Sequence, residues 1–241
     1  MDIAGFSAFF LLGALVIAIS FTLDWLYAKV LPIRSLYYAI RLPGIVLHEL
    51  SHVAGCLLAG ARIQNVVLFS KEGGSVTYTE PRIPVLGTVI INTAPIILLP
   101  LVLLLLTWAF SSFLGCNLVI TLPLTVDADL LQTLGTDISA IFVSNLIIRF
   151  NGWFLLYLYL CITVVLSLAP SVQDLRNAAT GLVLVAVICL LIIYSAYGPA
   201  VNLLKQALDL LAYPFMLGLI FEAVACVVSL PLVVVFWIRN R

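Results

Sequence analysis

Long apolar stretches separated by short polar connectors make up most of the chain. About 20 consecutive apolar residues are enough for an α-helix to cross the hydrocarbon core of a bilayer. All four tryptophans stand near the ends of these stretches, as in an interfacial aromatic belt. The pattern predicts an all-α polytopic membrane protein with a single transmembrane domain over residues 1–241. The expected transmembrane helices, about six of them, cover residues 3–28, 42–60, 84–113, 152–169, 177–197 and 214–238.

One connector follows a different pattern. Residues 62–79 contain two runs rich in β-branched side chains on either side of Gly73-Gly74. Two such runs around a glycine turn predict a small membrane-associated β-hairpin. A plain solvent-exposed connector is the alternative, and composition favours neither interpretation.

Two further stretches interrupt the apolar pattern. Residues 138–150 are expected to be amphipathic or re-entrant. Residues 200–212 carry apolar side chains on one side and polar side chains on the other, which predicts a helix lying in the membrane interface. Pro214 is expected to end that helix. The most polar long loop is 114–137, with Asp127, Asp129 and Asp137.

Composition excludes two classes of protein. Hydrophobic residues make up 64 % of the chain and charged residues 9 %, whereas about a quarter of a soluble domain is charged. The formal charge is zero and no basic patch is present, which excludes a nucleic-acid partner. The five cysteines are scattered singly without metal-type spacing. Cys56, one turn beyond His52, is interpreted as a small buried side chain.

The chemistry is concentrated in one short segment, His48-Glu49-Leu50-Ser51-His52, which holds the only two histidines of the chain. Residues four apart share one face of a helix, so both imidazoles can reach the same metal ion. Glu49 then stands beside that ion as a general base. A catalytic zinc normally takes three protein ligands and keeps a fourth position for water, so one more ligand is needed.

The third ligand has to come from an acidic residue, and three of these lie near membrane segments: Asp24, Asp174 and Glu222. Asp174 is the preferred candidate because it follows a break at Pro170 and falls in the first turn of an expected helix, where negative charge is tolerated. In the alternative interpretation Asp174 only caps that helix. We therefore expect one Zn²⁺ per chain, bound by the two histidines and Asp174.

These ligand types predict metal-assisted hydrolysis of an amide bond. Zinc polarises a carbonyl group and acidifies a water molecule. Glu49 can accept the proton of that water and return it to the leaving amine. A buried polar pair or a lapsed active site is the alternative, since the motif fixes only three letters.

The motif and its surroundings resemble the site-2 protease family of intramembrane zinc metalloproteases. The likeness rests on the His-Glu-x-x-His helix, a strand hairpin directly after it, and a Pro-then-Asp element that opens a later helix, so that the metalloprotease core is residues 42–197. The resemblance implies that His48, His52 and Asp174 bind zinc and that Glu49 is the general base. In place of the family's Asn-Pro and Asp-Gly pairs, this chain has Ala169-Pro170 and Asp174-Leu175.

The resemblance also implies a substrate site. The hairpin would pair with a substrate segment that is unwound into a strand. Val76 and Tyr78 of the hairpin and Asn92 of the next helix are the expected substrate contacts. As plain chemistry, Asn92 is more often an interhelical hydrogen-bonding residue.

The expected function is thus hydrolysis of peptide bonds in or near transmembrane segments, with a membrane-protein or peptide substrate, the lipid bilayer and a regulatory membrane protein as partners. The alternative is a catalytically inactive zinc-binding adaptor or chaperone for transmembrane clients. A metal transporter would need further acidic or histidine side chains along its pathway, and the chain has few. Basic residues divide almost evenly between the two sides, so the resemblance and the acidic loop favour a cell-membrane protein with its active site nearer the cytoplasm.

Overall fold

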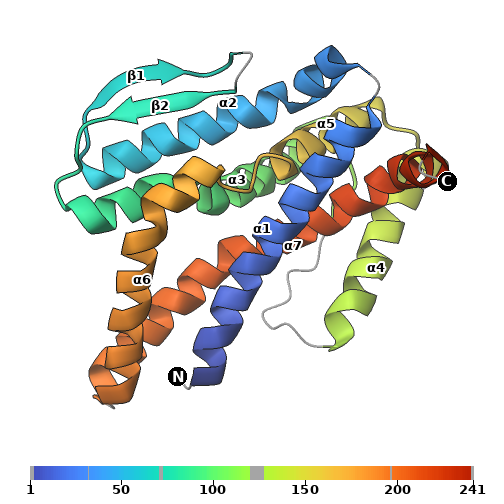
Figure 1. Ribbon diagram of the computed structural model, residues 1–241. Helices are drawn as coiled ribbons and strands as arrows, with labels where there is room; N and C mark the ends of the chain where they lie inside the picture. Colours follow the sequence, from blue (N-terminus) through green and yellow to red (C-terminus); the bar gives the residue numbers. More distant parts are fainter. Residues whose placement is uncertain (1–2, 32, 71–72, 120–127, 196, 240–241) are drawn as a thin grey trace.

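The computed structural model describes residues 3–31, 33–70, 73–119, 128–195 and 197–239. This part of the chain forms seven α-helices and one two-stranded sheet (Figure 1). A π-helical turn, Val143–Ile148, continues α4. The elements are α1 (Ile3–Val30), α2 (Arg34–Ala59), β1 (Ile63–Val67), β2 (Ser75–Tyr78), α3 (Pro84–Leu114), α4 (Ala128–Phe142), α5 (Gly152–Val165), α6 (Val172–Ser195) and α7 (Gly198–Arg239).

The structure confirms an all-α membrane protein, but it contains fewer long spans than the sequence predicted. Among the described residues five helices are long and apolar enough to cross a membrane, namely α1, α2, α3, α6 and α7. The expected span over 152–169 contains only the 14-residue α5. A helix of that length measures about 21 Å, short of the roughly 30 Å hydrocarbon core. One face of α5, which includes Phe154 and Val164, is fully buried inside the protein, while Trp153 and Leu155 on the other side are about half exposed.

The motif helix was expected over 42–60, with Pro43 near its start, but α2 begins at Arg34 and continues through Pro43. A proline has no N–H to donate to the carbonyl four residues earlier. That carbonyl, on Ala39, accepts a hydrogen bond from the Tyr159 hydroxyl of α5 instead (3.1 Å). The next backbone N–H, of Gly44, donates to Thr163 Oγ1 at 2.9 Å. Side chains of α5 therefore compensate the break and fix α2 against α5.

Pro214 does not end a helix either. The expected interfacial helix over 200–212 and the expected span from 214 form one helix, α7, with Pro214 inside it. Membrane helices tolerate an internal proline because neighbouring helices satisfy the freed backbone groups. The expected re-entrant stretch, 138–150, forms the end of α4 and the π-helical turn. Asp127 of the polar loop lies outside the described residues.

The hairpin prediction is confirmed. Strands β1 and β2 pair antiparallel, with Val66 opposite Val76 and Val67 opposite Ser75. Lys71 and Glu72 lie outside the described residues. The hairpin runs along α2 (Figure 1). It therefore covers one side of the helix that carries both histidines.

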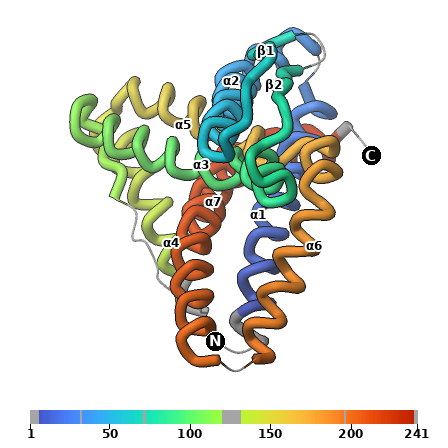
Figure 2. Tube along the Cα trace, turned by 90° about the vertical axis from the view of Figure 1, so that its left-hand side faces the viewer, coloured from blue at the N-terminus to red at the C-terminus, as the bar shows by residue number. Residues whose placement is uncertain are grey.

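Helix α3 determines how the other helices are placed. It packs against α2, α5, α6 and α7, while α1 runs alongside α7 (Figures 1 and 2). The main buried cluster gathers side chains of α1, α3, α5 and α7, among them Val16, Leu99 and Phe221. Because α2 and α6 both pack on α3, that helix sets the separation between the histidines and Asp174.

Candidate metal centre

The histidine motif lies on the face of α2 that is packed against other helices. His48, Glu49 and His52 are only 9 %, 7 % and 5 % exposed. Gly55, one turn further along α2, permits this close packing, because a Cβ at that position would lie 2.9 Å from Ile91 Cα of α3. Polar side chains buried in this way are costly unless they find partners. Both histidines find backbone partners.

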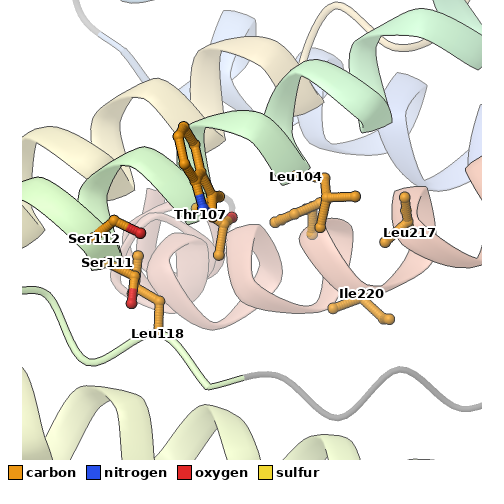
Figure 3. A pocket seen from close by; sticks show the side chains of 9 residues that line it. Leu104, Thr107, Ser111, Ser112, Leu118, Leu217 and Ile220 are labelled. Atoms are coloured by element: carbon orange, nitrogen blue, oxygen red, sulfur yellow. The ribbon is translucent and has the colours of Figure 1, made fainter.

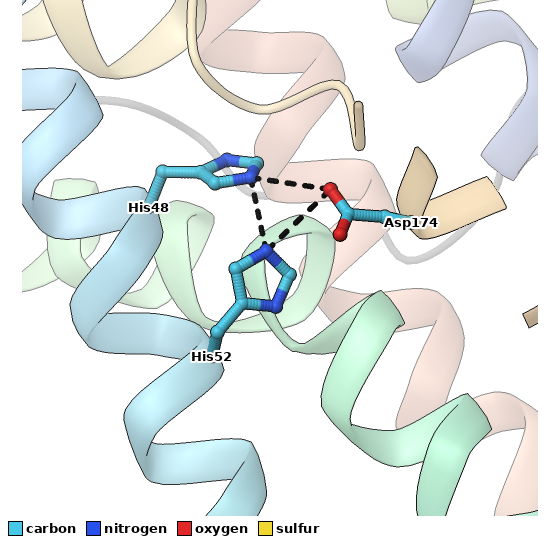
Figure 4. A group of neighbouring side chains, drawn as sticks. All are labelled: His48, His52 and Asp174. Atoms are coloured by element: carbon cyan, nitrogen blue, oxygen red, sulfur yellow. Dashed lines mark hydrogen bonds and ion pairs between the residues drawn. The ribbon is translucent and has the colours of Figure 1, made fainter. Parts of the chain in front are cut away.

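Each imidazole is oriented by a backbone carbonyl. His48 Nδ1 lies 2.7 Å from the Ser167 carbonyl oxygen, and His52 Nδ1 lies 2.8 Å from that of Ile91. A carbonyl oxygen only accepts hydrogen bonds, so each Nδ1 carries the proton and donates it. The Nε2 atoms of the neutral rings then present lone pairs toward one another, 3.2 Å apart (Figure 4). Metal-binding histidines are oriented through the opposite ring nitrogen in the same way.

Asp174 completes the group from the first turn of α6. Its Oδ2 lies 3.7 Å from His48 Nε2 and 3.5 Å from His52 Nε2 (Figure 4). The same carboxylate accepts a hydrogen bond from the Ser171 backbone N–H, and the Ser171 hydroxyl accepts one from the Asp174 N–H. This reciprocal pair is a capping box. Asp174 therefore caps α6 and faces the histidines at the same time, so the two interpretations of this residue are compatible.

The three atoms fit a tetrahedral zinc. Zinc-ligand bonds of about 2.0–2.1 Å place the corners of a tetrahedron about 3.3–3.4 Å apart, and the observed separations are 3.2, 3.5 and 3.7 Å. Two lone pairs and a carboxylate at this distance repel one another unless a cation lies between them. Among the described residues, His48, His52 and Asp174 are the one group of three metal-binding side chains found this close together.

Glu49 lies beside this group in a cleft of about 230 Å³, which His48, Gly73, Gly74 and Ser171 also line. Gly74 of the hairpin approaches the glutamate closely, because a Cβ on Gly74 would lie 2.6 Å from Glu49 Oε1. The hairpin thus contacts the candidate general base directly. Its position next to the two histidines suits proton transfer to and from a reacting group.

A comparison with known protein families gives one match. Residues 12–126 match the family described as Peptidase M50B-like, which is related to the site-2 proteases. These residues, just under half of the chain, are similar to that family. The matched part of this M50B-like chain contains the histidine motif, the hairpin and α3, but it ends before Asp174. Asp174 as a candidate third ligand is thus supported by the geometry and not by the match. No curated protein and no solved structure matches the chain.

The expected substrate-binding residues lie next to the metal group, and no observation tests their role. Asn92, 2 % exposed, donates to the Tyr78 hydroxyl at 3.1 Å and accepts from Asn177 of α6 at 3.5 Å. Asn92 therefore links β2, α3 and α6. Val76 is half-buried and packs with Cys56 and Ile91. Burial raises the pKa of Tyr78, so its hydroxyl stays neutral.

The sequence did not reveal the groups that hold the candidate metal ligands in place. Ser20 of α1, fully buried, donates to the Val165 carbonyl at 2.8 Å and accepts from the Ala169 N–H at 3.0 Å. It therefore fixes the segment between α5 and α6 that supplies the Ser167 carbonyl to His48. The Ser171-Asp174 spacing of a capping box was a usable signal in the sequence. No sequence signal marked the Ile91 carbonyl, because a residue of any type can supply a backbone carbonyl.

The other two acidic candidates lie outside the metal group. Asp24 forms an ion pair with Arg41, and Glu222 is fully buried in α7. A second cavity of about 230 Å³ lies between α3 and α7, lined by Thr107, Ser111 and neighbouring residues (Figure 3). Among the described residues that line it there is no acid and no histidine, so this lining does not resemble a catalytic zinc site.

Proposed function

We propose that this M50B-like protein is an intramembrane zinc metalloprotease that hydrolyses peptide bonds in or near transmembrane segments of membrane-protein substrates. One observation carries the proposal. His48 Nε2, His52 Nε2 and Asp174 Oδ2 converge within 4.8 Å of one another, on helices that are long and apolar enough to cross a membrane. Glu49 stands next to them, as a hydrolytic site requires.

Each residue then has a defined task. His48, His52 and Asp174 would hold the zinc ion, which would supply Lewis-acid polarisation of the scissile carbonyl and acidify a water molecule. Carbonyls of Ser167 and Ile91 keep the two rings aimed at the ion.

Glu49 accepts a proton from the attacking water as its oxygen bonds to the carbonyl carbon. Glu49 then donates that proton to the amide nitrogen as the C–N bond breaks. The products are a carboxylic acid and an amine, and the glutamate ends in its starting ionisation state. This cycle needs the Glu49 carboxylate within hydrogen-bond reach of the water.

A third cavity favours a substrate that comes from the membrane. It measures about 520 Å³ and is lined almost entirely by apolar side chains of α1, α3, α6 and α7. Pro170, four residues before Asp174, lines both this cavity and the cleft of Glu49, so the two meet at this residue. If an apolar segment of the substrate binds in this cavity, the unwound substrate residues next to it lie in the cleft of Glu49. Binding pockets are typically apolar with a few polar groups that fix orientation.

The location and partners follow from the same proposal. The five long apolar helices of the described chain make it a multi-pass membrane protein. We place the active site nearer the cytoplasmic side of a cell membrane, because of the resemblance to site-2 proteases. Its partners are then a membrane-protein substrate, the bilayer and a regulatory membrane protein.

The test uses the full-length protein in proteoliposomes with a co-reconstituted transmembrane substrate. The protein should hold about one zinc per chain. Glu49→Gln should keep the zinc and abolish cleavage, because the amide cannot accept the proton. Glu80→Gln, an exposed acid just after the hairpin, is the matched control and should cleave at the wild-type rate.

Two results would contradict the proposal. Undiminished cleavage by Glu49→Gln would remove this residue from the mechanism. Binding of transmembrane clients by the zinc-loaded wild type without any turnover would favour the adaptor function instead.

A further inference from the structure

The cleft that contains Glu49 extends along α2 to Arg41, seven residues before His48. Phe21 and Asp24 of α1 line that far end. Among the described residues that line the cleft, Arg41 is the one with a permanent positive charge. Ionised side chains within membrane segments are costly, so such a residue is a candidate for a functional role.

Two partners hold Arg41 in place. Its Nε lies 3.1 Å from Asp24 Oδ1, and its Nη1 donates a hydrogen bond to the Tyr37 hydroxyl at 2.9 Å. That hydroxyl donates in turn to Asp24 Oδ1 at 2.8 Å. The guanidinium carbon lies 5.5 Å from the centre of the Tyr37 ring. The cluster thus orients Arg41 before any substrate arrives, which lowers the entropy lost on binding.

These partners use only part of the hydrogen-bonding capacity of Arg41. A guanidinium group has five N–H donors in a planar fork. In the described part of the chain, Arg41 makes one side-chain hydrogen bond, to Tyr37, and one ion pair, to Asp24. Nη2 and the second N–H of Nη1 remain available. Such a fork binds a carboxylate through two parallel hydrogen bonds.

The exposure of the cluster suits this role. The side chains of Arg41 and Asp24 are each 23 % exposed and line the cleft, so the cluster is partly desolvated but accessible. Partial burial lowers the effective dielectric constant and strengthens a charge-assisted hydrogen bond. Asp24 neutralises Arg41 when no substrate is bound, which avoids a buried unpaired charge.

The distance between Arg41 and the metal ligands defines which carboxylate fits. Seven residues of α-helix rise about 10 Å. An extended peptide advances about 3.3 Å per residue, so this distance corresponds to roughly three residues. A substrate strand that places its scissile bond at His48 and Glu49 therefore places a residue about three positions away beside Arg41.

We infer that Arg41 is a specificity-determining residue that binds a substrate carboxylate about three residues from the scissile bond. The inference rests on the proposed proteolytic function and adds a substrate class to it. Either an Asp or Glu side chain or the free C-terminus of the substrate supplies the same chemical group. The two sources differ in whether the chain continues beyond that residue.

The experiment measures kcat/KM of the reconstituted full-length protein on matched substrates. One pair of substrates carries Glu or Gln three residues from the cleaved bond. This residue is placed on the N-terminal side of the bond in one version and on the C-terminal side in another, and the substrate chain continues beyond it. A second pair ends at that position as the free acid or as the amide. We expect a preference of about 10-fold for the carboxylate in at least one pair, as for a charge-assisted hydrogen bond. The pair that shows it identifies the source.

The decisive variant is Asp24→Asn/Arg41→Gln, because it removes both charges together and leaves neither unpaired. The ratio of kcat/KM for carboxylate over uncharged substrate should fall to about one. Arg34→Gln, an exposed cation of the same helix outside the cleft, is the control and should keep the wild-type ratio.

A merely structural role for the cluster would lower kcat/KM for both members of a pair equally and leave their ratio unchanged, which would overturn the inference. A wild-type ratio near one would overturn it as well, while cleavage itself would still support the proposed protease. Absence of all cleavage by the zinc-loaded wild type would instead contradict the proteolytic function.

Discussion

Gly74 is the position at which the hairpin contacts the candidate general base, and adding one methyl group there tests the mechanism. A Cβ on Gly74 would lie 2.6 Å from both Cδ and Oε1 of Glu49, and its three nearest atoms all belong to that side chain. Gly74 is not among the glycines with positive φ. Gly74→Ala should therefore displace the carboxylate without straining the backbone.

The size of the effect follows from these distances. Ordinary contacts begin at 3.4 Å, so the carboxylate has to move by about 0.8 Å. A misplacement of about 1 Å costs on the order of 100-fold in rate. We therefore expect kcat to fall about 100-fold, equivalent to about 2.7 kcal/mol in activation free energy. Zinc content should stay at about one ion per chain, because the added methyl group meets Glu49 and not a ligand.

The assay is single-turnover cleavage in proteoliposomes, with zinc measured by elemental analysis of the same samples. Gly135→Ala is the control, because a Cβ at that helical position meets nothing within 4 Å. The control should keep both the rate and the zinc. A Gly74→Ala protein with full zinc and a rate within about threefold of wild type would refute the assignment of Glu49 as the base.

Two further predictions concern the third ligand. Asp174→Ala should reduce bound zinc well below about one ion per chain, because two histidines alone hold the ion weakly. The control is Asp209→Ala, which changes an exposed acid of α7. Unchanged zinc content in Asp174→Ala would exclude Asp174 as a metal ligand. Gly181→Val should push α6 away from α3, because a Cβ there would lie 3.0 Å from the Val85 carbonyl oxygen. We expect a loss of about 1–3 kcal/mol in stability and about 10-fold in zinc affinity, measured by thermal unfolding and zinc titration. Wild-type stability and zinc affinity in Gly181→Val would show that packing at Gly181 does not position Asp174.

Features that depend on local spacing were predictable from the sequence. His48 and His52 share a helix face because they are four residues apart, whatever surrounds that helix. The hairpin could be expected because two β-branched runs flank Gly73-Gly74. In both cases the residues that decide the structure are close in the chain, so tertiary packing had little to add.

Predictions that required knowledge of the surroundings were less accurate. The apolar run over 152–169 has the composition of a membrane span, yet α5 is short and one of its faces, with Phe154 and Val164, is buried against protein. Hydropathy does not distinguish a lipid environment from a protein interior, since both are apolar. Pro43 and Pro214 were expected at helix ends, but both lie inside helices. For Pro43, the Tyr159 hydroxyl of a distant segment bonds to the carbonyl that the proline leaves free.

The amino-acid sequence by itself determined that this chain is a membrane protein and that one of its helices presents two imidazoles and a carboxylate on a short segment. Only the tertiary structure decided that Asp174 faces those imidazoles and that the carbonyls of Ser167 and Ile91 orient them. These groups are far apart in sequence, and their distances are set by how α2, α5 and α6 pack around α3. Glycines at helix contacts, such as Gly55 and Gly181, permit that close approach.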